Sequence, residues 1–105
     1  MGSVLASTIC HYCGGRATTE DHVVPRRALP KPLSRLPYWF NAMNVVPSCK
    51  HCNNRKSHRR STCACQQCRG AWGAAKANGW IREDYLEIVV VVSRKQWSGR
   101  PLQLV

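Results

Sequence analysis

Long apolar runs are missing from this chain of 105 residues. The longest, from Ile88 to Val92, is far too short to cross a bilayer, which takes about 20 apolar residues in a helix. The sequence does not open with a basic segment followed by an apolar one, so we expect no signal peptide. A chain of this length suits one small domain and leaves little room for a second.

Acidic residues are also scarce. Sixteen Lys and Arg stand against five Asp and Glu, which gives a formal net charge of +11. An excess this large in a small domain predicts a polyanionic partner, most simply a nucleic acid. The alternative is a basic protein whose charge serves only solubility.

Cysteine, in contrast, is abundant. The seven cysteines fall into three groups, which are Cys10-x-x-Cys13, Cys49-x-x-Cys52 and Cys63-x-Cys65-x-x-Cys68. Such spacing is typical of metal-binding turns rather than of a disulfide framework, and the odd count argues against complete pairing. We therefore expect a reducing compartment, the cytosol.

The first two groups predict a structural zinc site. Four thiolates, from Cys10, Cys13, Cys49 and Cys52, can close a tetrahedron around Zn²⁺. A site of this kind keeps no open position for water or substrate, so its zinc would stabilise the fold and clamp both ends of segment 14–48. The alternative is four unrelated buried thiols.

The pattern along the chain predicts a small α+β fold. Four prolines between residues 25 and 37 exclude a long helix there and indicate a basic loop. The expected elements are strands at 18–24 and 44–47, a helical turn at 36–42, a basic helix at 53–60, an Ala-rich helix at 70–78 closed by Gly79, and a C-terminal hairpin of strands 85–92 and 101–105.

Four motifs follow one another in a distinctive order. They are Cys10-x-x-Cys13, Glu20-Asp21-His22-Val23-Val24-Pro25, Asn44-Val45-Val46-Pro47 and Cys49-x-x-Cys52-Asn53-x-x-Lys56. In this order they resemble the HNH endonuclease family, and the resemblance covers about residues 10–60. It implies the ββα-metal fold, in which a two-stranded hairpin and a helix surround one catalytic divalent ion.

The resemblance assigns roles to four residues. It makes His22 the general base that takes a proton from water, because neutral imidazole titrates in the right range. Asp21 and Asn53 would hold the catalytic ion, and Asn53 at the family's last histidine position makes this a His-Asn-Asn variant. Because an amide oxygen is a hard ligand, we expect Mg²⁺ or Mn²⁺ there. Asn44 would tie the hairpin backbone and fix His22, although a plain turn residue would look the same in sequence.

By the same resemblance, double-stranded DNA is the expected partner. Phosphate contacts are expected from Arg26, Arg27, Arg55 and Lys56, whereas Arg59 and Arg60 suit a solvated face. Nucleases of this family often act as dimers or with partners, so a homodimer or a larger nuclease or packaging assembly stays open, in the cytoplasm of a bacterium or a phage-infected cell. Residues 1–8 would then be a flexible N-terminus, 9–60 the nuclease core, and 61–105 an extension packed on it.

The third cysteine group lacks a fourth thiol. His58 lies five residues before Cys63 at the end of the expected basic helix, so we predict a second structural zinc held by His58, Cys63, Cys65 and Cys68. His11 and His51, inside the metal-binding turns, are expected to be bystanders. The alternative is three reduced thiols, one or two of them packed against Trp72.

Two other functions fit parts of the sequence. A non-catalytic zinc module that binds nucleic acid needs the cysteines and the positive charge, but not Asp21, His22 and Asn53 together. A zinc-framed protein-interaction domain would instead use its four tryptophans, Trp39, Trp72, Trp80 and Trp97, as a contact surface. The positive charge weighs against the second of these.

Overall fold

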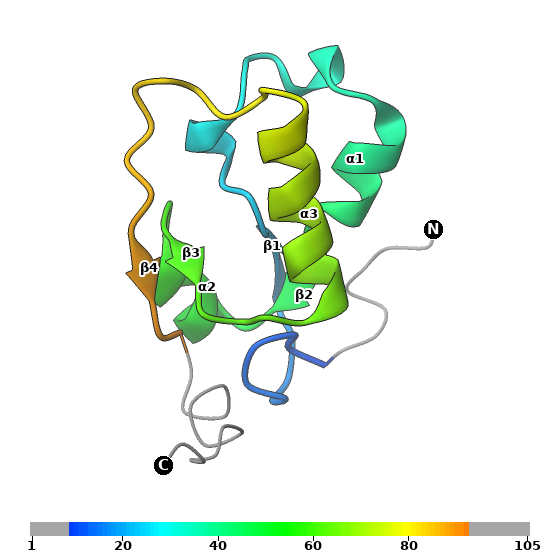
Figure 1. The fold of residues 1–105 in the computed structure, drawn as a ribbon. Helices are drawn as coiled ribbons and strands as arrows, with labels where there is room; N and C mark the ends of the chain where they lie inside the picture. The colour runs from blue at the N-terminus through cyan, green and yellow to red at the C-terminus, as the bar shows by residue number, and fades with distance from the viewer. Residues whose placement is uncertain (1–8, 93–105) are drawn as a thin grey trace.

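Two short antiparallel strands lie at the centre of the computed structural model, which describes residues 9–92 (Figure 1). Strand β1 (Thr19–His22) pairs with β2 (Val45–Ser48), so that Asp21 is opposite Val46 and His22 opposite Val45. Both strands fall within or beside the segments predicted for them. Because alternate residues of a strand face opposite sides, Asp21 is buried while His22 stays half-buried.

The segment between these strands folds into short turns, as its prolines predicted. In each turn, the carbonyl of the preceding proline accepts the backbone N–H of the third residue of the helical segment, at 2.9–3.1 Å. Proline suits this place because its φ is already close to the helical value. The turns are η2 (Arg26–Ala28), η3 (Leu33–Arg35) and α1 (Tyr38–Met43).

The two remaining helices both begin at a Cys-x-x-Cys pair. Helix α2 (Lys50–Lys56) has Cys49 as its N-cap, and helix α3 (Gln66–Ala77) has Cys65. Each N-cap sulfur accepts the backbone N–H of the second cysteine, at 3.3 Å and 3.4 Å. The helices therefore start before the predicted 53–60 and 70–78, because the thiol takes the capping role usually filled by Ser, Thr, Asp or Asn. Gly79 follows α3 with a φ of 69°, as expected for a helix end.

The C-terminal half differs from the predicted hairpin. Strand β4 (Val89–Val90) is shorter than 85–92 and pairs in parallel with β3 (Arg60–Ser61), directly after α2. The expected partner strand, 101–105, lies outside the described residues, as does the predicted N-terminus 1–8. An ion pair between Arg60 and Glu87, at 2.8 Å, joins the two segments beside the parallel ladder.

One hydrophobic core joins the N-terminal strand region to helix α3 and strand β4. Val24 and Val46 from the strand region, Phe40 from α1, and Trp72 from α3 are all buried in one cluster that also includes Val92. Figure 1 shows α3 standing between α1 and the β3–β4 pair, and α1 contacts α3 directly. Among residues 9–92, the helices are too short and too polar to span a bilayer.

Candidate functional site

The first metal group is the one that the sequence predicted. The sulfurs of Cys10, Cys13, Cys49 and Cys52 all lie within 4.8 Å of one another, and those of Cys13 and Cys49 are 3.8 Å apart. Zn–S bonds of about 2.3 Å in a tetrahedron place sulfurs about 3.8 Å apart. All four cysteines are free of disulfides. This group could hold a zinc ion.

The pKa values of three thiols in this group are shifted, and their thiolate forms favour binding of a cation. Burial opposes ionisation of Cys10, but backbone N–H groups of Cys13, Cys49 and Tyr12 outweigh it and lower the Cys10 pKa to about 6. Burial and the neighbouring thiols raise the pKa of Cys52, and burial also raises that of Cys13. Four sulfurs at this spacing repel one another as thiolates, and a divalent cation removes that repulsion.

The second metal group contains His11, not His58. The His11 Nε2 atom lies 3.8 Å from Cys63 Sγ, 3.3 Å from Cys65 Sγ and 3.5 Å from Cys68 Sγ. Zn–N and Zn–S bonds of ordinary length in a tetrahedron place nitrogen and sulfur about 3.6 Å apart. The three cysteines and His11 could therefore hold a second zinc, and the prediction that His11 is a bystander is wrong.

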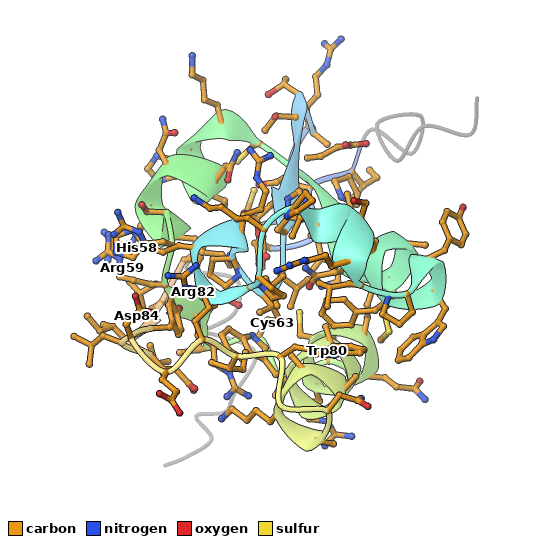
Figure 2. The ribbon with its side chains drawn as sticks, turned by 90° about the horizontal axis from the view of Figure 1, so that it is seen from above. His58, Arg59, Cys63, Trp80, Arg82 and Asp84 are labelled. Atoms are coloured by element: carbon orange, nitrogen blue, oxygen red, sulfur yellow. The ribbon has the colours of Figure 1, made fainter. Side chains whose placement is uncertain are left out.

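His58 is directed elsewhere. It is exposed, and its Nδ1 atom lies 3.2 Å from the hydroxyl of Ser57. Figure 2 shows it near Arg59, Arg82 and Asp84 at one side of the molecule, apart from Cys63. The prediction of His58 as the fourth ligand is wrong because α2 ends at Lys56 and a positive φ at Ser57 turns the chain. Spacing along the sequence favoured His58, whereas the fold brings in a ligand from more than fifty residues away.

The second group also pairs charges internally. Hydrogen bonds from Cys68 and His11 outweigh burial and lower the pKa of Cys63 to about 3. The contact with Cys63 raises the His11 pKa against the effect of burial, and the Cys63 contact and burial raise the Cys68 pKa. These shifts favour the charged forms of Cys63 and His11. A bound zinc would take the place of the remaining protons of the group.

One turn serves both metal groups. Cys10 and Cys13 face the first group, while His11 between them faces the second. The remaining residue of the turn, Tyr12, points into the protein and is buried. A signal for His11 was therefore present in the sequence, because a histidine inside a metal-binding turn is held in place by the metal ligands on either side of it.

Tyr12 begins a buried polar network that reaches α2. Its hydroxyl donates to Asp21 Oδ2 at 2.5 Å, and burial together with the Asp21 charge raises the Tyr12 pKa, so the proton stays on the hydroxyl. Lys56 Nζ lies 3.2 Å from Asp21 Oδ2 and donates to the His22 carbonyl at 2.7 Å. Burial lowers the pKa of Lys56, and Asp21 opposes that effect. Each charge thus has a partner away from water.

This network corrects one of the predicted phosphate contacts. The Lys56 side chain is 1% exposed and ion-paired, so it is not on a surface that nucleic acid could reach. The helical period of α2 places Lys56 on the buried face, together with Cys52 four residues earlier. Arg55 stays exposed, with its Nε atom donating to the Val91 carbonyl at 2.8 Å.

Three of the four predicted catalytic residues meet at a small pocket, and Asn44 does not line it. The pocket has a volume of about 310 Å³, and Asp21 and His22 of β1 and Asn53 of α2 all line it. Arg26 and Arg27 of η2 form its basic side. Burial, followed by the charge of Arg26, lowers the pKa of His22, so the imidazole is neutral at pH 7.

Asn44 binds the backbone of the two residues that follow His22. It is fully buried, its Oδ1 atom accepts the Val24 N–H at 2.8 Å, and its Nδ2 atom donates to the Val24 carbonyl at 3.0 Å. Its own carbonyl accepts the Val23 N–H at 2.8 Å. These bonds fix the backbone directly after His22, which is the contact the sequence interpretation expected of Asn44.

The tryptophans do not form one continuous surface in the described part of the chain. Trp72 is buried in the core, and Trp80 packs on Phe40 with ring centroids 4.9 Å apart. Trp39 is 54% exposed and lies against Trp80. Trp97, the fourth member of the proposed contact surface, is outside the described residues.

No family model, curated protein or solved structure matches the chain. The class that the fold and the site define is therefore a small α+β protein with two cysteine-rich groups that could bind zinc.

Proposed function

We propose that this protein is a metal-dependent endonuclease of the HNH type, which hydrolyses phosphodiester bonds in DNA with His22 as the general base. One observation carries the proposal. Asp21, His22 and Asn53 come from two elements far apart in the sequence, yet they line one small pocket with a basic side. The order of antiparallel β1 and β2 followed by α2 supports the ββα-metal arrangement.

The environment of His22 suits proton abstraction. Burial and Arg26 keep the imidazole neutral, and it makes no side-chain hydrogen bond with another described residue, so its ring nitrogens are free to bind water. Asn44 holds the backbone that carries the ring. His22 would take a proton from water as that water attacks phosphorus, while Arg26 and Arg27 bind the phosphate oxygens.

The oxygens beside His22 fit a hard divalent cation. Asp21 offers a carboxylate and Asn53 an amide oxygen. Mg²⁺ commonly binds one or two carboxylates together with several waters and substrate phosphates. A carboxylate has about four acceptor positions, so Tyr12 and Lys56 leave Asp21 capacity for an ion. A bound Mg²⁺ or Mn²⁺ would stabilise negative charge on the phosphate and on the leaving oxygen.

A second function is favoured by one contact. Because Asp21 is buried and already engaged by Tyr12 and Lys56, the chain could instead be a non-catalytic zinc module that binds nucleic acid. In that case the Asp21–Lys56 pair would serve folding alone.

Nicking of supercoiled plasmid separates the two functions. We expect cleavage with Mg²⁺ or Mn²⁺, none after mild EDTA treatment that leaves structural zinc in place, and a loss of about 10²–10⁴-fold or more in His22→Ala. The matched control is His51→Ala, because His51 is an exposed histidine of α2 outside the pocket. This variant should cleave DNA at the wild-type rate. Metal-independent binding without any cleavage by the wild-type protein would favour the non-catalytic module.

A further inference from the structure

A larger groove adjoins the pocket of the proposed nuclease. It has a volume of about 1030 Å³ and shares Arg26, Arg27 and His58 with the smaller pocket. The opposite wall of the groove is the segment from Arg82 to Ile88. The volume of the groove lies just above the range of about 300–1,000 Å³ for ligand pockets. Asp21, His22 and Asn53 do not line this groove.

Hydrogen bonds between its walls form the groove in advance of any ligand. The Arg82 N–H donates to the Ala28 carbonyl at 2.8 Å, which ties the far wall to η2. The Tyr85 hydroxyl donates to the His58 carbonyl at 2.7 Å, which ties it to the end of α2. Figure 2 shows His58, Arg82 and Asp84 gathered on this side. A preformed groove loses little entropy when a ligand binds.

The lining combines positive charge with exposed apolar side chains. The cations are Arg26, Arg27, Lys31 and Arg82, and the one acidic lining residue, Asp84, is paired with Arg82 at 3.0 Å. Leu86 is 72% exposed and Ile88 is 44% exposed, both on the wall of the groove. An exposed ion pair contributes little, so a phosphate can compete with Asp84 for Arg82.

This combination distinguishes between paired and unpaired DNA. A duplex presents its phosphates outward and keeps its bases stacked inside, so it offers no base faces for Leu86 and Ile88 to contact. An unpaired strand exposes both phosphates and base faces, and proteins that bind single strands join a basic groove to aromatic side chains on which the bases stack. In this groove the exposed apolar side chains of Leu86 and Ile88 offer the surface for the base faces. The groove also shares Arg26 and Arg27 with the pocket that holds His22, so the two sites are adjacent.

We propose that this groove binds an unpaired DNA strand beside the cleavage site, with its phosphates on Arg26, Arg27 and Arg82 and its bases against Leu86 and Ile88. The inference rests on the proposed function, because the bound strand is the flank of the DNA that the nuclease cuts. The preferred substrate is then a junction between duplex and single strand rather than continuous duplex.

Binding by the uncleaving His22→Ala protein tests the groove. Fluorescence anisotropy would compare a blunt DNA duplex with the same duplex carrying an unpaired thymidine tail, at equal salt. We expect the tailed DNA to bind about three- to tenfold more tightly, at the lower end of what base contacts contribute. Adding Leu86→Gln should remove this difference and leave blunt duplex binding unchanged. Because Leu86 is largely exposed, the substitution should not disturb folding.

Two charge variants refine the test. Adding Asp84→Asn releases Arg82 and should strengthen binding of the tailed DNA, whereas Arg69→Gln, an exposed charge of α3 outside the groove, should not change the preference. Equal affinity for tailed and blunt DNA, or a preference that survives Leu86→Gln, would overturn the groove assignment.

The outcome is separable from that of the proposed function. If wild-type protein fails to cut any DNA with Mg²⁺ while the tailed duplex still binds through Leu86, the nuclease proposal fails and the groove stands. If the protein cuts continuous duplex and tailed duplex at equal rates and binds them equally, the nuclease stands and the groove assignment fails.

Discussion

At the scale of single residues, His11 and its neighbours show how one turn can serve two metal groups. Cys10 and Cys13 face one set of sulfurs and His11 faces the other, with its Nε2 atom 3.3–3.8 Å from three thiols. Each group has the number and kind of ligands that close a zinc tetrahedron. The turn is therefore fixed from both sides, and Tyr12 is directed into the core toward Asp21.

A pair of histidine substitutions tests this arrangement. His11→Ala should lower the zinc content from about two ions per chain to about one, because three thiols remain at the second group. His58→Ala is the matched control and should keep both ions, since His58 lies outside both groups. Elemental analysis of purified protein measures the ratio. Two ions per chain in His11→Ala, or one ion in the wild type with freely alkylated Cys63, would contradict the assignment.

The pKa of His22 predicts the acid side of the activity profile. Its pKa is lowered from 6.5, first by burial and then by Arg26, and a general base must be unprotonated. Cleavage should therefore rise with pH below 6.5 and become flat above it. Arg26→Gln removes a positive charge that disfavours the imidazolium, so the acid limb should move to higher pH. The measurement is kcat/KM against pH at saturating Mg²⁺.

The control for this shift is Arg35→Gln. Arg35 is exposed and lines neither pocket, so replacing it should leave the pH of the acid limb unchanged. An acid limb that does not move in Arg26→Gln would mean that another group sets the profile.

At the scale of elements, the ion pair of Lys56 and Asp21 joins α2 to β1. Lys56→Met should lower the free energy of unfolding by about 3–5 kcal/mol, because it leaves the buried Asp21 carboxylate without its cation. The His22 carbonyl would also lose its donor. The double variant with Asp21→Asn should recover part of the loss. Urea unfolding measures both effects, and a Lys56→Met protein as stable as the wild type would show that the pair contributes nothing.

Elements that depend on local sequence could be predicted, and those set by distant contacts could not. The β-branched residues around Asp21 and Val45 and the prolines between them gave the right strands and turns. The start of α2 was placed too late, because the capping group is the Cys49 sulfur. The pairing of β4 with β3 was missed, since a parallel ladder between segments almost thirty residues apart leaves no pattern in either strand.

The same division applies to the site. The motifs around Asp21, His22 and Asn53 identified residues that the fold does bring to one pocket. Burial of Lys56 and the partner of Cys63 depend on how α2 and α3 pack against the first turn of the chain. The spacing of residues within one segment cannot predict contacts between segments that are far apart in the sequence.

At the scale of the whole molecule, most acidic residues within 9–92 form ion pairs, whereas most basic residues of the same range do not. Asp21 is buried with Lys56, Glu87 binds Arg60 and Lys76, and Asp84 binds Arg82. Zinc in a four-thiolate group leaves a net charge of −2, and in a three-thiolate group −1, so metal loading lowers the formal +11 to about +8. A large positive excess thus remains, and the two pockets gather part of it at Arg26 and Arg27.

Salt dependence of DNA binding should report this excess. Each duplex phosphate neutralised by the protein releases counterion and contributes about −0.9 to the slope of log K against log salt concentration. Replacing Arg26 and Arg27 together with Gln should flatten the slope by about 2, since both arginines line both pockets. The matched control replaces Lys50 and Arg69, which are exposed outside both pockets, and should change the slope less. Titrations of His22→Ala protein with blunt duplex over a range of NaCl concentrations measure it. Equal slopes for the two double variants would place the DNA-binding surface on another face of the protein.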